Sequence, residues 1–153
     1  VRLKVMQAVL LSVHVLAGIL FVGPVAVAAS LFPRYAPVAR AVEGADRSVG
    51  VARVLHRITR VYGVLALAVP VVGLALAGVQ GRSTEVWIIV SMVLTAAAGG
   101  LLVLQIAPRQ QRALAEPDDG RQLRALGMVT GIFNLLWVIV VVLMVAHPGS
   151  RYL

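Results

Sequence analysis

Four long stretches without a charged side chain make up most of this sequence, and short basic segments separate them. The four stretches cover residues 5–33, 61–81, 86–108 and 125–150. About 20 apolar residues suffice to cross a lipid bilayer as a helix, and each stretch reaches that length. The apolar residues are continuous rather than alternating, which argues against the strands of a membrane β-barrel. The pattern predicts an all-α polytopic membrane protein, a four-transmembrane-helix bundle forming a single domain over residues 1–153.

Prolines near the ends of these stretches refine the predicted helix limits. Proline cannot donate a backbone hydrogen bond, and it disfavours helical backbone in the residue before it. Pro33 and Pro37 are expected to end the first helix, Pro108 the third and Pro148 the fourth. The resulting helices are expected at about residues 6–32, 58–79, 86–107 and 126–146.

Two further prolines, Pro24 and Pro70, lie inside the first and second predicted helices. Each is expected to kink its helix, which membrane proteins tolerate when neighbouring groups satisfy the freed carbonyl. The connection between the second and third helices, residues 80–85, is short. These two helices are therefore expected to be antiparallel neighbours.

The composition agrees with burial in lipid rather than in water. Hydrophobic residues make up 60% of the chain and charged residues 13%, whereas a soluble domain has about 25% charged residues. The net charge is +8, but the basic residues lie in the short segments between apolar stretches. Basic residues in such segments set the orientation of the spans and contact lipid phosphates. No separate basic domain remains to bind nucleic acid. The chain has no cysteine, which excludes disulfides and thiolate metal sites.

The distribution of basic residues predicts how the chain is oriented. One side of the membrane would carry four of them: Arg2, Lys4, Arg82 and Arg151. The first and third loops would carry ten: Arg34, Arg40, Arg47, Arg53, Arg57, Arg60, Arg109, Arg112, Arg121 and Arg124. Because positive loops remain in the cytoplasm, both termini are expected outside. The expected location is a bacterial cytoplasmic (inner) membrane.

Small residues at helical spacing indicate where helices approach each other closely. Gly127 and Gly131 form a GxxxG pair in the fourth predicted helix, and such pairs let helix backbones approach in a bilayer. We expect this pair to serve mainly in packing within the chain, with association between chains as the alternative.

His14 is the one readily titratable side chain well inside an apolar stretch. Ionisable groups at membrane depth are costly and often functional, so His14 is a candidate haem or metal ligand or proton relay. The alternative is a neutral imidazole bonded to a carbonyl, or to a polar side chain such as Asn134, Thr130 or Gln105. No second axial ligand is well placed, because His56 and His147 belong to opposite edges of the membrane. We therefore expect no bound cofactor.

Other candidate chemistry is sparse. Met144 and His147 are three residues apart on one helical face, and sulfur with imidazole can suit copper, although methionine is also ordinary apolar filling. Asp118 and Asp119 lie in a Pro-Asp-Asp-Gly turn that explains both acids without a cation. There is no paired carboxylate, catalytic triad or phosphate-binding loop. The sequence does not predict an enzyme.

A basic stripe precedes the second apolar stretch. Arg53, Arg57 and Arg60 share one face of a predicted helix, opposite an apolar face formed by Val51, Val54, Leu55 and Ile58. This segment is expected to extend the second helix along the cytoplasmic interface. The three arginines are candidates for contact with anionic lipid phosphates, with acidic residues of a partner protein, or with both.

The segment His14-Val15-Leu16-Ala17-Gly18-Ile19-Leu20-Phe21-Val22-Gly23 resembles the first helix of the CopD-like integral membrane proteins. An uncharacterised branch of that grouping is similar in length and number of spans. The resemblance covers mainly this helix and the four-span layout. By analogy with relatives of this type that have protoporphyrinogen oxidase activity, the resemblance would imply that the histidine of the first helix, here His14, binds haem. The present chain departs from that pattern, because it has neither an intramembrane lysine nor a second well-placed histidine.

The function expected from the sequence is that of a non-catalytic accessory subunit. It would pack through its helices on other integral membrane subunits of a larger complex, either a transporter such as a lipid-uptake system or a respiratory complex. Few polar groups lie within the spans, and the short segments between them are not expected to form a soluble catalytic domain. The alternative is a haem- or copper-binding membrane protein centred on His14.

Overall fold

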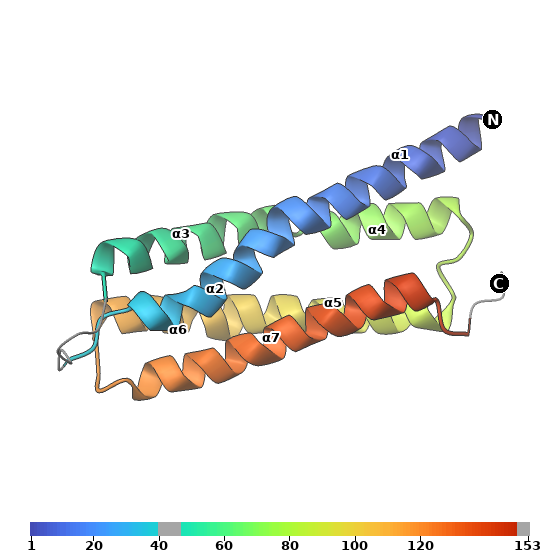
Figure 1. Ribbon diagram of the computed structural model, residues 1–153. Helices are drawn as coiled ribbons and strands as arrows, with labels where there is room; N and C mark the ends of the chain where they lie inside the picture. The colour runs from blue at the N-terminus through green and yellow to red at the C-terminus, as the bar shows by residue number, and fades with distance from the viewer. Residues whose placement is uncertain (40–46, 150–153) are drawn as a thin grey trace.

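The computed structural model describes residues 1–39 and 47–149, which form four long helices (Figure 1). No β-strand occurs in this part of the chain. Each helix is long and apolar enough to cross a membrane, and we refer to them as the first to fourth spans: Arg2–Tyr35, Val49–Val79, Val86–Ala115 and Arg121–Ala146. The predicted all-α, four-helix architecture is confirmed, and the chain is built as a multi-pass membrane protein.

Three of the spans are divided by local irregularities. The first consists of α1 (Arg2–Ala17), the π-helix η1 (Gly18–Val22) and α2 (Gly23–Tyr35). The second consists of α3 (Val49–Leu65) and α4 (Ala68–Val79), and the third of α5 (Val86–Leu101), η2 (Leu102–Ile106) and α6 (Ala107–Ala115). The fourth is the single helix α7 (Arg121–Ala146). Arg40, Glu43, Asp46 and Arg151 lie outside the described residues.

The spans are longer than the sequence predicted, and two prolines do not end a helix as expected. Pro33 lies inside α2, which continues to Tyr35. Pro108 lies in the first turn of α6, which follows η2 without a break, so the helix also continues through this proline. By contrast, the fourth span does end before Pro148, at Ala146.

Each interruption of a span precedes a proline. The π-helix η1 comes before Pro24, a turn at residues 66–67 before Pro70, and η2 before Pro108. A proline within a regular helix removes one hydrogen bond and clashes with the carbonyl four residues earlier. A π-helical turn or a short break changes the local hydrogen bonding. The interruptions therefore let long helices accommodate these prolines.

The first span crosses the bundle diagonally and connects its two halves (Figure 1). Its α1 part packs along α4, and its α2 part packs against both α3 and α7. The third span packs along α7, and its α6 part also contacts α3. By contrast, α4 and α5 make few contacts, although a short connection joins them. The expected close pairing of the second and third spans is thus limited to the end where α3 meets α6.

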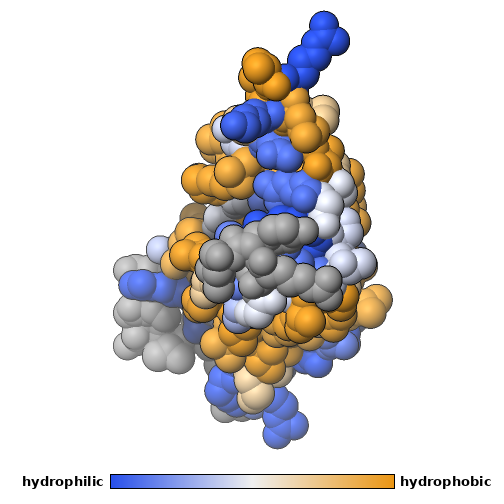
Figure 2. Space-filling model, turned by 90° about the vertical axis from the view of Figure 1, so that its right-hand side faces the viewer, coloured by the Kyte–Doolittle hydropathy of each residue, from blue (hydrophilic) through white to orange (hydrophobic). Residues whose placement is uncertain are grey.

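The two ends of the bundle differ in composition. We call the end that carries the α2–α3 and α6–α7 connections the basic end, and the end that carries both termini and the α4–α5 connection the terminal end (Figure 1). The main core packs α2, α3, α6 and α7 together around Phe32, Ile106 and Leu126. Apolar side chains cover much of the perimeter seen from the terminal end (Figure 2). Such a surface is suited to lipid or to other membrane helices.

Candidate functional sites

His14 forms a hydrogen bond between the first and second spans. Its side chain is 9% exposed, and its Nδ1 lies 3.0 Å from the carbonyl oxygen of Val69. Because a carbonyl can only accept, Nδ1 carries the proton and donates it. The imidazole lies over Gly73, where an added Cβ would be 2.8 Å from the ring atom Cε1. Gly73 therefore allows α4 to approach the histidine closely.

The bond to a carbonyl is one of the arrangements that the sequence left open for His14. None of Asn134, Thr130 and Gln105 is its partner. His56 lies on α3 at the basic end, and His147 follows α7 at the terminal end. The described residues contain no group of three histidine, cysteine or acidic side chains that could hold a metal ion.

The basic stripe lies on α3 as predicted. Arg53, Arg57 and Arg60 are exposed, and the helix begins at Val49, nine residues before the predicted start at residue 58. Of the four residues predicted to form the apolar face, two pack inward and two do not. Leu55 is buried and Ile58 packs against the core, but the side chains of Val51 and Val54 are exposed. The inward face instead includes polar residues that the sequence analysis did not single out.

Those polar residues link α3 to α6. Gln110 on α6 is fully buried, and its Nε2 donates to Thr59 Oγ1 at 3.3 Å. The Thr59 hydroxyl in turn donates to the Leu55 carbonyl at 2.9 Å. The Oε1 atom of Gln110 lies 2.8 Å from Nδ1 of His56 and must accept, so His56 donates from Nδ1. A single glutamine thus holds both His56 and Thr59 of α3.

The outer side of the same helix carries a small groove of about 290 Å³. His56, Arg57 and Arg60 line its polar part, and Val61 and Val64 line its apolar part. Arg53 does not line it. The stripe therefore contains two arginines at a concave site and one arginine on the open helix surface.

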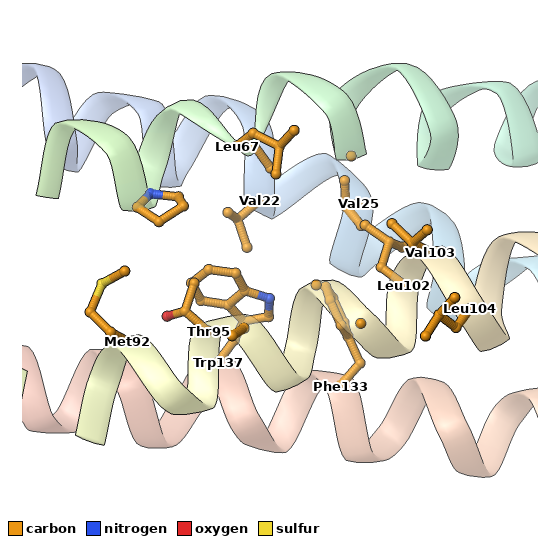
Figure 3. A pocket seen from close by; sticks show the side chains of 16 residues that line it. Val22, Val25, Leu67, Met92, Thr95, Leu102, Val103, Leu104, Phe133 and Trp137 are labelled. Carbon is orange, nitrogen blue, oxygen red and sulfur yellow. The ribbon is translucent and has the colours of Figure 1, made fainter. Parts of the chain in front are cut away.

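A larger cavity of about 540 Å³, which we call the central cavity, lies between the second and third spans (Figure 3). Its lining is almost entirely apolar and includes Trp137 and Phe133 of α7, whose rings meet edge to face. All three helix interruptions border it. Val22 comes from η1, Leu67 from the break before Pro70, and Leu102 from η2. The sequence gives no direct sign of this cavity, because it forms where spans fail to pack against each other.

The terminal end holds a second polar cluster, which the sequence analysis missed. The Glu85 carboxylate is buried and pairs with the Arg82 guanidinium, with Nε to Oε1 at 2.8 Å. The indole N–H of Trp87 also donates to Glu85. The His147 ring packs on Trp87 at a tilt of 37°, with 4.4 Å between centroids, and Met144 packs against the apolar cluster around Trp87. The proposed copper pair of Met144 and His147 therefore sits against an indole.

The GxxxG pair of α7 faces away from the bundle. Gly127 and Gly131 are exposed, and no atom would lie within 4 Å of a Cβ added to either. The expected role in packing within the chain is therefore wrong for these two glycines. In contrast, Gly63 and Gly73 do pack tightly inside the bundle, with Leu102 and His14 respectively.

Asp118 precedes the fourth span and holds the turn that leads into α7. Its carboxylate accepts from the backbone N–H of Gly120 at 2.8 Å and of Gln122 at 3.1 Å. Desolvation raises the pKa of Asp118, but these hydrogen bonds and the nearby Arg124 together hold it below the usual value. Ala39 also donates to the Asp118 carbonyl at 2.7 Å, which joins the first and third loops.

Comparison with known proteins adds no relative to this picture: no protein-family model, curated protein or solved structure matches the chain.

Proposed function

We propose that this chain is a non-catalytic accessory subunit of a larger complex in a bacterial cytoplasmic membrane, with both termini outside. The host is a multi-subunit transporter, such as a lipid-uptake system, or a respiratory complex. The observation that carries the proposal is the outward position of Gly127 and Gly131. In a bilayer, small residues on a helix surface allow another helix to approach closely.

The glycines are part of a continuous exposed face of α7. Leu135, Val138 and Val142 are also exposed, and they follow Gly131 at spacings of four, three and four residues, which keep side chains on one side of a helix. The face therefore combines two small residues with branched apolar ones along most of the span. This composition suits packing against a helix of another subunit.

The experiment is co-purification from native membranes of wild-type protein and a Gly127→Leu/Gly131→Leu variant. Neither added side chain meets an atom of its own chain at the Cβ position, so the fold is expected to persist. Partners should be lost in the variant and retained in Gly78→Leu, since Gly78 is equally unobstructed but lies on α4. Wild-type protein that migrates alone, or a double variant that keeps every partner, contradicts the proposal.

The basic stripe supplies a second contact in the same proposal. Arg53, Arg57 and Arg60 would face acidic residues of a partner at the cytoplasmic rim, in addition to anionic lipid. Loss of a desolvated charge pair between proteins costs about 2–5 kcal/mol. A triple Arg→Glu variant that inserts with correct topology should therefore dissociate from the complex. If it keeps every partner, the stripe contacts lipid alone.

One observation favours the alternative of a haem- or copper-binding protein centred on His14. The hydrogen bond to the Val69 carbonyl places a proton on Nδ1, so Nε2 is the ring nitrogen that a metal would take. Metal-bound histidines in proteins usually have their other nitrogen held in this way. A Soret band in the purified protein that disappears in His14→Ala, or stoichiometric copper by elemental analysis, would favour this alternative over the accessory role.

A further inference from the structure

We propose that α3 and the central cavity together bind one anionic phospholipid. Its phosphate would lie in the groove formed by His56, Arg57 and Arg60, and one acyl chain would enter the cavity between the second and third spans. The inference does not depend on the accessory-subunit role. It differs from a general attraction between the basic stripe and the membrane surface, because it assigns a defined position to the headgroup and to the chain.

Charge favours an anion in the groove. Arg57 and Arg60 are one helical turn apart on the same side of α3, and α3 contains no acidic residue. His56 borders the groove with a ring that the buried Gln110 holds through Nδ1, so the two guanidinium groups supply the donors for an anion. Guanidinium groups suit phosphate oxygens because their N–H donors are arranged as a fork.

An apolar path leads from this groove to the cavity. Arg60, Val64 and Leu67 follow each other at spacings of four and three residues, so they lie on one face of the second span. Val64 lines the groove and Leu67 lines the cavity. These two side chains are 68% and 61% exposed, respectively. An acyl chain that leaves a phosphate at Arg60 can therefore run along this face into the cavity.

The cavity has the size and lining that an acyl chain needs. Its volume of about 540 Å³ falls in the range of pockets that hold small ligands, roughly 300–1,000 Å³. Leu67 on one side and Val103 and Leu104 on the other are exposed as well as lining it, which places its opening toward the bilayer. From Arg60 to Pro70 the helical rise is about 15 Å, close to half the hydrocarbon thickness of a bilayer.

The test uses the indole of Trp137 as a reporter, because it lines the cavity. In a Trp87→Phe background, the emission comes from Trp137 alone, since the chain has two tryptophans. The protein is placed in phosphatidylcholine nanodiscs that contain a small fraction of phosphatidylglycerol with brominated acyl chains. We expect quenching that saturates at a low fraction of the brominated lipid. Brominated phosphatidylcholine at the same fractions should quench weakly and without saturation.

Arg57→Ala/Arg60→Ala should raise the fraction of brominated phosphatidylglycerol at half-maximal quenching about 10-fold or more. Each basic group near the membrane surface favours anionic lipid about fivefold. Arg53→Ala is the matched control, because Arg53 belongs to the same stripe but does not line the groove. Equal effects of Arg53→Ala and of either single variant, Arg57→Ala or Arg60→Ala, would reduce the site to general surface charge and overturn the proposal.

Gly100→Leu tests whether the acyl chain enters the cavity. Gly100 lines the cavity, and a Cβ there meets no atom within 4 Å, so the new side chain can fill the space that the lipid chain would take. Saturable quenching should be lost in Gly100→Leu and retained in Gly78→Leu. Retention in Gly100→Leu would show that the chain does not enter the cavity.

A second measurement does not require the Trp87 substitution. Native mass spectrometry of the wild-type protein in detergent should show one retained phosphatidylglycerol in preference to phosphatidylcholine. Retention should be lost in both Arg57→Ala/Arg60→Ala and Gly100→Leu, and it should persist in Arg53→Ala. No preference between the two lipids would overturn the proposal.

Discussion

The basic end and the terminal end of the bundle are built from the same kinds of apolar helix, yet they pack differently. At the basic end, four helices share one core around Phe32, and a buried chain of polar groups joins α3 to α6 through Gln110. At the terminal end, α4 packs mainly on α1 and makes few contacts with α5, to which a small cluster around Trp87 joins it. The cavity lies where the close packing of the basic end gives way to this looser arrangement.

The difference shows what holds helices together inside a membrane. Lipid is as apolar as a leucine side chain, so burying apolar surface against another helix gives little net driving force. Close packing and satisfied polar groups must supply the stability instead. The basic end has both over several helices, whereas nearer the terminal end the Arg82–Glu85 pair is local in sequence and a hydrogen bond from His14 to the Val69 carbonyl joins the first and second spans.

The largest expected effect comes from the core of the basic end. Phe32 is completely buried, and Phe32→Ala should lower the free energy of unfolding by about 3–5 kcal/mol, because the cavity left behind removes packing contacts. Ile88→Ala in the small cluster of the terminal end should cost less, about 2 kcal/mol, at the low end of the range for isoleucine. Both values can be measured by reversible unfolding in mixed micelles. Equal costs at the two sites would remove the proposed difference between the ends.

The buried polar chain is expected to contribute the next largest effect. Gln110→Leu leaves Thr59 Oγ1 without its donor and His56 Nδ1 without its acceptor. A buried polar group that loses its partner costs about 1–3 kcal/mol. The neighbouring Gln111 is exposed, so Gln111→Leu should be close to neutral in the same unfolding assay. A neutral Gln110→Leu would mean that packing alone holds α3 to α6.

The contact between His14 and Gly73 offers a comparison nearer the terminal end. Gly73→Ala places a methyl group 2.8 Å from His14 Cε1 and should destabilise the protein by about 1–2 kcal/mol through overpacking. In a His14→Ala background, the same change should cost less than about 0.5 kcal/mol, because the obstructing ring is gone. The double-mutant cycle measures this coupling. Equal costs in both backgrounds would show that the close approach of α1 and α4 does not depend on this pair.

The smallest expected effect is the pH dependence contributed by Asp118 at the start of α7. Its pKa is lowered in the folded protein, so its contribution to stability is present above the unfolded value of about 3.9 and is lost as the pH falls through the lower folded value. Asp118→Asn retains a capping side chain without the charge. Between about pH 6 and pH 3, the variant should lose slightly less thermal stability than the wild type. An identical pH profile would assign no role to the charge.

The sequence alone determined the number of spans, their helical nature and the helical basic stripe on α3. These properties follow from local hydropathy and residue spacing, which do not depend on which helices become neighbours. Proline positions predicted the interruptions near residues 24 and 70, but not the continuation of helix through Pro33 and Pro108. Whether a proline ends a helix depends on whether hydrogen bonds around it can rearrange, and that is not written in the local pattern.

Only the tertiary structure decided which way each helix faces. It turned Gly127 and Gly131 outward, directed His14 to the Val69 carbonyl, and buried Gln110 between α3 and α6. It also left α4 and α5 apart and so created the central cavity. The rotation of an apolar helix has no strong sequence signal, because every side tolerates lipid. It is set by shape complementarity and by a few polar contacts between residues far apart in the chain.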